Sequence, residues 1–148
     1  MTAYPFIWQE MSNTVTSTQA QTLLREALTV MRHAGIHHLP VVDNGELSGI
    51  LSMRDVPDET AMLRVGDVMT RCVHTCGINE RVGRAVDLMI EHRINSIPVV
   101  SDKGAVVGII TSTDLLKYLR RTLHQDSGEP FERLIAHLGE TGDDWPEP

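Results

Sequence analysis

The sequence contains little of what several protein classes require. Two cysteines in 148 residues are too few for the disulfide framework of a small secreted domain. Aromatic residues make up only 4% of the chain, and no apolar run approaches the roughly 20 residues of a membrane helix. The first residues, Met1 to Trp8, lack the charged region and cleavage site of a secretory signal. We therefore expect a cytoplasmic protein with no membrane partner.

Basic residues are scarce as well. Thirteen Lys and Arg stand against 20 Asp and Glu, which gives a net charge of −7 at pH 7, and no dense basic run occurs. Nucleic-acid surfaces are typically basic, so we expect no nucleic-acid partner. With 41% hydrophobic residues, the chain is able to bury one core, or two small cores that pack on each other.

What the sequence does contain is an internal duplication. Residues 49–55, Gly-Ile-Leu-Ser-Met-Arg-Asp, recur as residues 108–114, Gly-Ile-Ile-Thr-Ser-Thr-Asp. Pro-Val-Val at 40–42 likewise recurs at 98–100. Units of about 60 residues are only marginally stable alone, so the two repeats should pack together as one globule.

Each repeat reads as β-α-β-β-α, which predicts a mixed α/β (α+β) fold with the two repeats packed as a pseudo-twofold pair. Pro57 makes the last helix of the first repeat doubtful, because proline lacks the N–H that a helix interior needs. The expected elements of the first repeat are a strand at 14–16, a helix at 19–33, and strands at 38–42 and 47–51. Those of the second are a short helical entry within 61–69, a strand at 73–75, a helix at 80–92, strands at 96–100 and 105–110, and a helix at 113–124.

The pattern also predicts domain boundaries. We expect an N-terminal arm at residues 1–10, which packs Phe6 and Trp8 onto the body. The first repeat is expected at 11–60 and the second at 61–124. Residues 125–148 are expected to form an acidic, partly disordered tail with one short helix at 131–138.

The two strand-to-helix corners, 52–55 and 111–114, have the chemistry of an anion and sugar site. A helix start presents unpaired N–H groups and a partial positive charge, which favour a phosphate. An aspartate is able to accept two hydrogen bonds from a vicinal diol such as ribose. The structural alternative is a plain capping box, in which the hydroxyl and the acid bond only to their own backbone. The duplication favours the ligand-binding interpretation, and the sequence leaves both open.

A second pattern is Cys72-Val73-His74-Thr75-Cys76. An extended strand would place Cys72, His74 and Cys76 on one face, which suits zinc or a redox thiol pair. The alternative is small residues on a half-buried strand. Because the usual two-residue spacing of zinc cysteines is absent, we predict no metal site and no cofactor. No nucleophile and base pair is recognisable, so we predict that the protein is not an enzyme.

The duplicated unit resembles the CBS domain, named after cystathionine β-synthase, and the pair resembles a Bateman module. The paired Pro-Val-Val strands, the two Gly-h-h-[Ser/Thr]-x-x-Asp turns (h is apolar) and their spacing carry this resemblance over residues 9–120. It implies a stand-alone regulatory or sensor module that binds an adenosine nucleotide (AMP-, ADP- or ATP-like) between its repeats. It also implies a homodimer that transmits the bound state to an unknown downstream protein. A metal- or thiol-responsive sensor and a purely structural interaction module remain the alternatives.

The resemblance also implies the residues of two ligand sites. Asp55 and Asp114 would hold the ribose hydroxyls. Ser52 and Thr111 would face phosphate, with Arg54 and Thr113 as equivalent neighbours. The adenine positions are Ser12, Thr14, Ile36 and His38 in one cleft and Thr70, Cys72, Ile94 and Ser96 in the other. The residues expected to reach phosphate from the opposite repeat are His37, His38, Asn95 and Ser96.

The two sites are not expected to be equivalent. His37 and His38 offer donor groups that Asn95 and Ser96 do not, so the clefts should differ in affinity. Few basic residues lie near the turns, which predicts that a monophosphate suits the protein better than a triphosphate.

Overall fold

The computed structural model describes residues 4–13 and 15–125. The chain divides into two compact units, residues 1–116 and 117–148, and the boundary falls within the last helix, α5 (Ser112–Gln125). Of the second unit, the structure describes only residues 117–125, the C-terminal part of α5. The predicted acidic tail after residue 125 and its short helix therefore lie outside the described residues.

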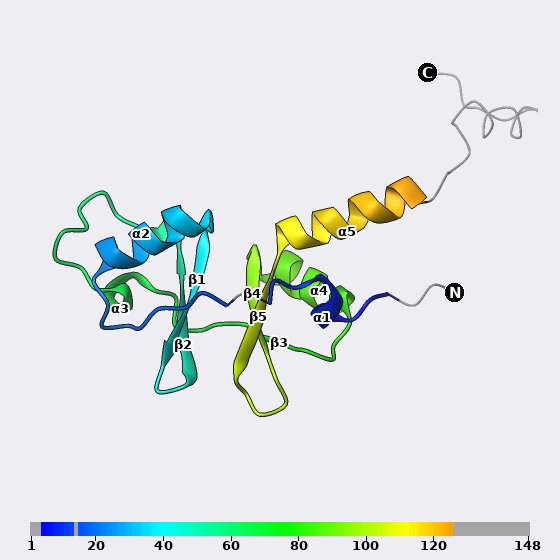
Figure 1. Cartoon of the computed structure of the whole chain (residues 1–148), viewed down its shortest axis with the longest axis horizontal. Coiled ribbons are helices and arrows are strands. Elements are labelled where there is room, and N and C mark those ends of the chain that lie inside the picture. Colours follow the sequence, from blue (N-terminus) through cyan, green and yellow to red (C-terminus); the bar gives the residue numbers. More distant parts are fainter. Residues whose placement is uncertain (1–3, 14, 126–148) are drawn as a thin grey trace, which may run out of the picture. The chain divides into compact units, whose positions relative to one another are not determined.

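Two antiparallel hairpins form the framework of the first unit (Figure 1). Each contains a register shift at the equivalent point, between Val41 and Val42 in one and between Val99 and Val100 in the other. The repeated Pro-Val-Val sequence thus adopts the same irregular strand twice. The first hairpin pairs β1 (His38–Asp43) with β2 (Glu46–Ser52), and the second belongs to a sheet of order β3 (Cys76–Gly77), β4 (Ser96–Val100) and β5 (Val106–Thr111).

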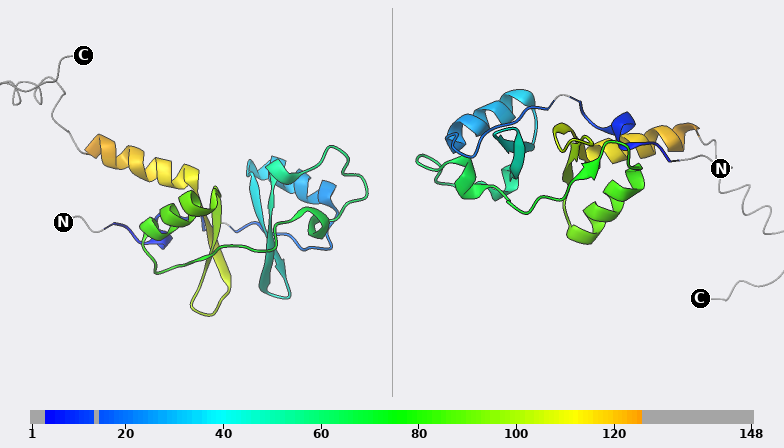
Figure 2. Two further views of the ribbon diagram at one scale, coloured as in Figure 1. Left: turned by 180° about the vertical axis from the view of Figure 1, so that it is seen from behind. Right: turned by 90° about the horizontal axis from the view of Figure 1, so that it is seen from below.

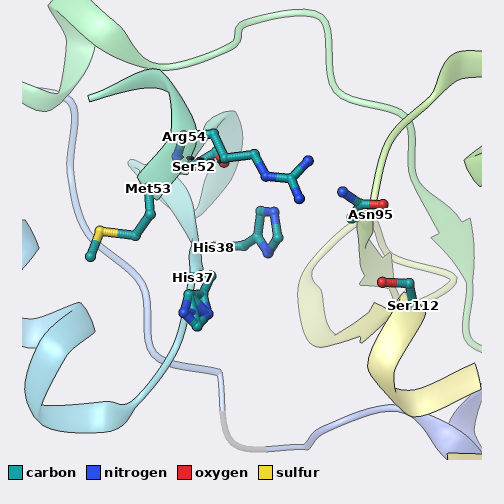
Figure 3. A pocket seen from close by; sticks show the side chains of 7 residues that line it. All are labelled: His37, His38, Ser52, Met53, Arg54, Asn95 and Ser112. Carbon is teal, nitrogen blue, oxygen red and sulfur yellow. Dashed lines mark hydrogen bonds between the residues drawn. The ribbon is translucent and has the colours of Figure 1, made fainter. Parts of the chain in front are cut away.

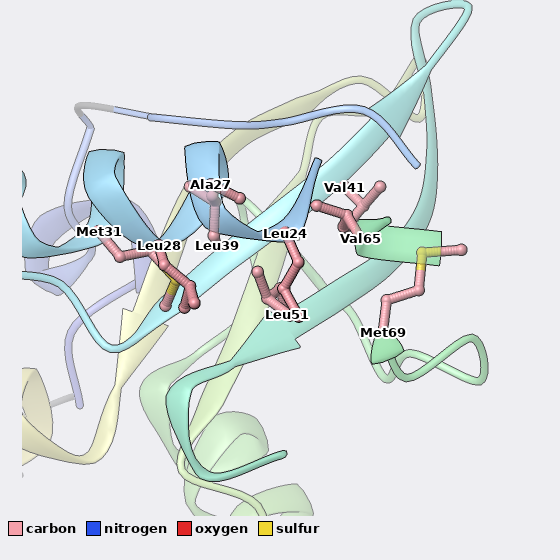
Figure 4. Close-up of a cluster of buried hydrophobic side chains, with 9 residues drawn as sticks. All are labelled: Leu24, Ala27, Leu28, Met31, Leu39, Val41, Leu51, Val65 and Met69. Carbon is pink, nitrogen blue, oxygen red and sulfur yellow. The ribbon is translucent and has the colours of Figure 1, made fainter. Parts of the chain in front are cut away.

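Short helices pack on these hairpins. In the first repeat, an apolar stripe of α2 contributes to a core cluster with β1, β2 and α3 (Figure 4). Burial of this cluster supplies the hydrophobic stabilisation of the first repeat. The helices are α1 (Ile7–Glu10), α2 (Leu24–Ala34), the 3-10 turn η1 (Met53–Asp55), α3 (Val65–Val68), α4 (Val82–His92) and α5. The cluster residues are Leu24, Ala27, Leu28, Met31, Leu39, Val41, Leu51, Val65 and Met69.

The mixed α/β class and the duplicated order of elements are confirmed, whereas several local predictions are wrong. The predicted helix at 19–33 begins only at Leu24. Leu23 bridges to Arg64, and the Leu24 amide donates to Leu63 O at 2.8 Å, so tertiary pairing holds the chain extended just before the helix. The doubt over a final helix in the first repeat is confirmed, because only the three-residue η1 forms before Pro57.

Both short leading strands were also predicted wrongly. Residues 15–17 are not a strand, and the first repeat makes only a single bridge there, from Thr18 to Val41; Thr14 lies outside the described residues. The strand predicted at 73–75 is instead β3, because only Cys76 and Gly77 pair with β4. In the N-terminal arm, Ile7 rather than Trp8 is buried, with exposures of 0% and 49%.

The leading segment of each repeat pairs with the hairpin of the other repeat. Ser12 exchanges backbone hydrogen bonds with Ile109 in β5, and Thr70 exchanges them with Ile50 in β2. The N-terminal helix α1 accordingly packs against α4 and β5 of the second repeat (Figure 2). Each hairpin therefore has a segment of the other repeat beside its second strand: Ser12 lies beside β5, and Thr70 lies beside β2.

This crossing explains the two motif glycines. A Cβ on Gly108 would lie 2.5 Å from Met11 Sδ and 2.9 Å from Ser12 O. A Cβ on Gly49 would meet Met69 Sδ at 2.6 Å in the same way. Real Cβ atoms do not approach other atoms so closely, so the repeated glycine is required by the neighbouring segment rather than by a ligand.

None of the helices in the described part of the chain is long and apolar enough to cross a bilayer.

Candidate functional site

The corner after β2 leaves an acidic side chain available. β2 ends at Ser52, whose Oγ accepts a hydrogen bond from the Arg54 amide at 3.3 Å. The turn η1 ends at Asp55, because the chain is extended at Val56 before Pro57. Within the described residues, the Asp55 carboxylate makes no hydrogen bond and is exposed. It is therefore free to accept hydrogen bonds from a ligand.

The equivalent corner after β5 is occupied by its own capping box. Asp114 Oδ2 accepts from the Thr111 amide at 2.8 Å and from Thr111 Oγ1 at 2.7 Å. The Asp114 amide in turn donates to Thr111 Oγ1 at 3.3 Å. Two residues that the resemblance assigns to a ligand are thus bonded to each other in this structure. A ligand at Asp114 has to replace these contacts, whereas a ligand at Asp55 does not.

A cavity of about 190 Å³ connects Asp55 to two segments of the second repeat, and we call it the Asp55 cleft. It brings together Thr70, Cys72, Ile94 and Ser96, the adenine positions of one predicted site, with the predicted Ser52 and Arg54 corner. The pairing follows from the crossing of Thr70 onto β2. The full lining is His38, Ile50, Ser52, Arg54, Asp55, Thr70, Cys72, Val73, His74, Arg93, Ile94, Asn95 and Ser96.

A larger cavity, of about 380 Å³, adjoins this cleft, and we call it the central cavity. In Figure 3, Arg54 extends from η1, just after β2, toward Asn95 of the other repeat, and His38 lies beside it. The two cavities share His38, Ser52, Arg54 and Asn95. The central cavity is lined by His37, His38, Ser52, Met53, Arg54, Asn95 and Ser112.

The side chains around His38 affect its protonation. Burial lowers the pKa of His38 below 6.5, and the neighbouring His37 and Arg54 lower it further, while Asp55 acts in the opposite direction. His38 is therefore neutral at pH 7 and keeps one N–H donor. A bound anion would favour its protonated form.

Arg93 lies in the Asp55 cleft with an unusual backbone conformation. It follows α4 with φ of 54°, in the left-handed region, and the equivalent residue after α2 is Gly35 with φ of 65°. Glycine adopts this conformation without strain, whereas a residue with a side chain pays a conformational cost. Arg93 was not among the site residues predicted from the sequence. The comparison of the two helix ends, Gly35 against Arg93, was the available signal.

Other predicted site residues lie elsewhere. Ile36 packs partly buried against the core of the first repeat, and Ser12 pairs with β5; neither lines the two cavities. Thr111, Thr113 and Asp114 also lie outside both linings. Thr14, which was predicted to share an adenine position with Ser12, Ile36 and His38, lies outside the described residues.

The cysteine and histidine pattern does not form one face. Cys76 is buried in β3, while Cys72 and His74 are exposed, and His74 stacks on His92 with ring centroids 3.8 Å apart. Burial, followed by the charge of Glu80, raises the pKa of Cys76 to about 11, so this thiol remains protonated. Among the residues that the structure describes, no three His, Cys, Asp or Glu side chains are grouped to hold a metal.

The fold and the cleft define a class of protein: a tandem α/β repeat with a small-molecule cavity between the corner of one repeat and the leading segments of the other. The CBS domain profile matches residues 7–58 and 65–121, so this chain belongs to the CBS domain family, as a tandem pair.

Comparison with known proteins agrees with this assignment. The chain is 38% identical over 113 residues to inosine-5'-monophosphate dehydrogenase of Methanocaldococcus jannaschii, covering 75% of this chain but 22% of that enzyme. It thus spans only about a fifth of the length of the first curated relatives that it matches.

Two solved structures show the same fold. The CBS domain pair of protein MJ0100, in complex with 5'-methylthioadenosine and S-adenosyl-L-methionine, has a TM-score of 0.75 and 28% identity over 81% of this chain and 99% of that one. The cytosolic domain of the Mg²⁺ channel MgtE, in complex with ATP, has a TM-score of 0.65 and 28% identity over 73% of this chain and 46% of that one.

Proposed function

We propose that this protein is a regulatory module that binds an adenine nucleotide in the Asp55 cleft. The observation that carries this proposal is the free carboxylate of Asp55, which faces a cavity built from both repeats. The carboxylate accepts the ribose hydroxyls, and the adenine lies between the segments that contain Thr70 and Ile94. The adenosine compounds in two structural relatives support the same ligand class.

Binding at this position supplies a regulatory signal. The ligand touches β2 of the first repeat and the segments around Thr70 and Ile94 of the second, so it stabilises the arrangement of repeats that it fits best. A partner protein that distinguishes this arrangement then reads the bound state. Binding rather than catalysis is the proposed role, and the activities of the longer relatives are not transferred to this chain.

We also propose that two copies associate through exposed apolar helix positions. Ile90 on α4 is 74% exposed, and Leu116 on α5 is 63% exposed. Side chains of this kind are often covered by a partner subunit. Size-exclusion chromatography with light scattering measures the molar mass of the protein in solution. A monomer mass at high concentration would refute the proposed dimer.

Isothermal titration with adenosine, AMP, ADP and ATP tests the ligand assignment. We expect binding to the wild type and a loss of about 10- to 100-fold in affinity in Asp55→Ala, because hydrogen bonds to a charged acceptor are removed. The matched control is Asp58→Ala, which removes an exposed acid just beyond the corner that lines neither cavity. If no adenine compound binds, or if both variants behave alike, the proposed site is wrong.

A further inference from the structure

The Asp55 cleft and the central cavity differ in their chemistry, and together they define the class of nucleotide. We propose that they select adenine nucleotides with two or three phosphates over the monophosphate. Arg54, which lines both cavities, determines this selectivity, and Arg93, in the wall of the Asp55 cleft, is a second cation for the phosphate next to the sugar. This inference rests on the proposed adenine-nucleotide site. It assigns the phosphate chain to the central cavity.

The sizes of the cavities favour a ligand that extends from one to the other. The Asp55 cleft alone, at about 190 Å³, is smaller than a typical small-molecule site of about 300–1,000 Å³. The adjoining central cavity adds about 380 Å³ and shares four lining residues with the cleft. A nucleoside that places its sugar at Asp55 therefore directs its phosphates past Ser52 and Arg54 into the central cavity.

The lining of the central cavity suits a polyanion. Its polar side chains are hydroxyl, amide, imidazole and guanidinium groups, and no carboxylate lines it. Asp55, in the adjoining cleft, is the one acid among the lining residues of the two cavities. Phosphate oxygens accept hydrogen bonds from such donors, and arginine contacts to phosphate are among the strongest in proteins. The central cavity therefore suits the phosphate chain, while Asp55 marks the sugar end of the combined site, where Arg93 also lies.

Neither arginine is neutralised within the protein. In the part of the chain that the structure describes, Arg54 and Arg93 form no ion pair with an acidic side chain. Arg93 in addition occupies a left-handed backbone position where the first repeat has Gly35. A strained cation without an acidic partner, in a cavity wall, indicates a role in binding an anion.

Comparison of the two repeats shows that the other repeat has no arginine at the position equivalent to Arg54 or to Arg93. The residue equivalent to Arg54 in the second repeat is Thr113, and the residue equivalent to Arg93 in the first is Gly35. The sequence-based expectation of a monophosphate rested on the small number of basic residues near the turns. It did not place Arg54 and His38 in the lining of both cavities, or Arg93 in the lining of the Asp55 cleft.

The test is isothermal titration of the full chain with AMP, ADP and ATP, without divalent cations and at one ionic strength. We expect the wild type to bind ADP at least about tenfold more tightly than AMP, because each phosphate adds charge-assisted contacts. Arg54→Thr, which copies Thr113, should remove most of this preference. Arg25→Thr, on an exposed face of α2 outside both linings, is the control for net charge.

Arg93→Gly, which copies Gly35, separates binding from folding. Because it relieves the left-handed strain, it should raise the Tm while it weakens ADP binding by about tenfold. The inference is overturned if AMP binds as tightly as ADP, or if Arg54→Thr leaves their ratio unchanged, even where Asp55→Ala abolishes binding. If no adenine compound binds the wild type at all, the proposed function fails as well.

Discussion

Replacing each motif aspartate with alanine should have a different effect: Asp114→Ala should lower stability, and Asp55→Ala should weaken nucleotide binding. Asp114→Ala removes the acceptor of two hydrogen bonds from Thr111, at 2.8 and 2.7 Å, and so opens the capping box of α5. Loss of a helix cap costs about 1 kcal/mol of unfolding free energy, which lowers the Tm by roughly 3–5 °C in a chain of this size. Asp55→Ala removes no hydrogen bond and should change stability by less than about 0.5 kcal/mol.

Urea unfolding followed by circular dichroism measures both effects, and titration with ADP supplies the second readout. Asp55→Ala should retain the wild-type midpoint and lose nucleotide binding. Asp114→Ala should lose stability, and Asp114→Asn should recover part of it because the amide oxygen remains an acceptor. The reasoning is refuted if Asp55→Ala is destabilised as strongly as Asp114→Ala, since Asp55 would then be a structural cap.

Three further predictions follow from the packing and the protonation states. A thiol reagent at pH 8 should label the exposed Cys72 quickly and Cys76 only on unfolding, and bound nucleotide should slow the labelling of Cys72; equal rates would contradict the structure. Gly108→Ala should cost about 1–3 kcal/mol in urea unfolding, because its Cβ would lie 2.9 Å from the backbone oxygen of Ser12 as well as 2.5 Å from Met11 Sδ, and an unchanged midpoint would exclude this close approach. Because the pKa of folded His38 is below 6.5, the unfolded chain binds more protons as the pH falls from 6.5 toward the folded value, so stability should decrease there. The decrease should be smaller in His38→Asn, and identical pH profiles would refute the assignment.

Much of the fold was predictable because it follows from local patterns that occur twice. The hairpin strands alternate or run apolar between turn residues, and the Pro-Val-Val segments have the same register shift in both hairpins. The helices α2 and α4 carry apolar stripes at helical spacing. These signals depend on residues that are near one another in the chain, so a single sequence contains them.

The errors arose where distant segments pair. The bridge from Leu23 to Arg64 holds the chain extended, so α2 begins later than predicted. The strand β3 is short because only Cys76 and Gly77 pair with β4. Local propensity contains no information about such partners. The same limitation applies to the crossing of Thr70 onto β2, which decides which adenine positions meet Asp55.

The sequence predicted many residues of the candidate site, but not which of them meet in one cavity. Ser52, Arg54 and Asp55 were identified from the motif, and the structure brings them together with Thr70 and Ile94. His38, Cys72, Asn95 and Ser96 of the same cleft were also among the predicted residues, whereas Ile50, Val73, His74 and Arg93 were missed because their positions depend on the packing of the two repeats. Nor does the motif indicate that one of its aspartates is bonded to its own cap and the other is free.

A crystal structure of the protein with ADP tests the central claim most directly. We predict adenosine in the Asp55 cleft, with both ribose hydroxyls donating to the Asp55 carboxylate and the diphosphate between Arg54 and Asn95. An Asp55 cleft that stays empty at saturating ADP, or a nucleotide bound with its sugar away from Asp55, would contradict the account.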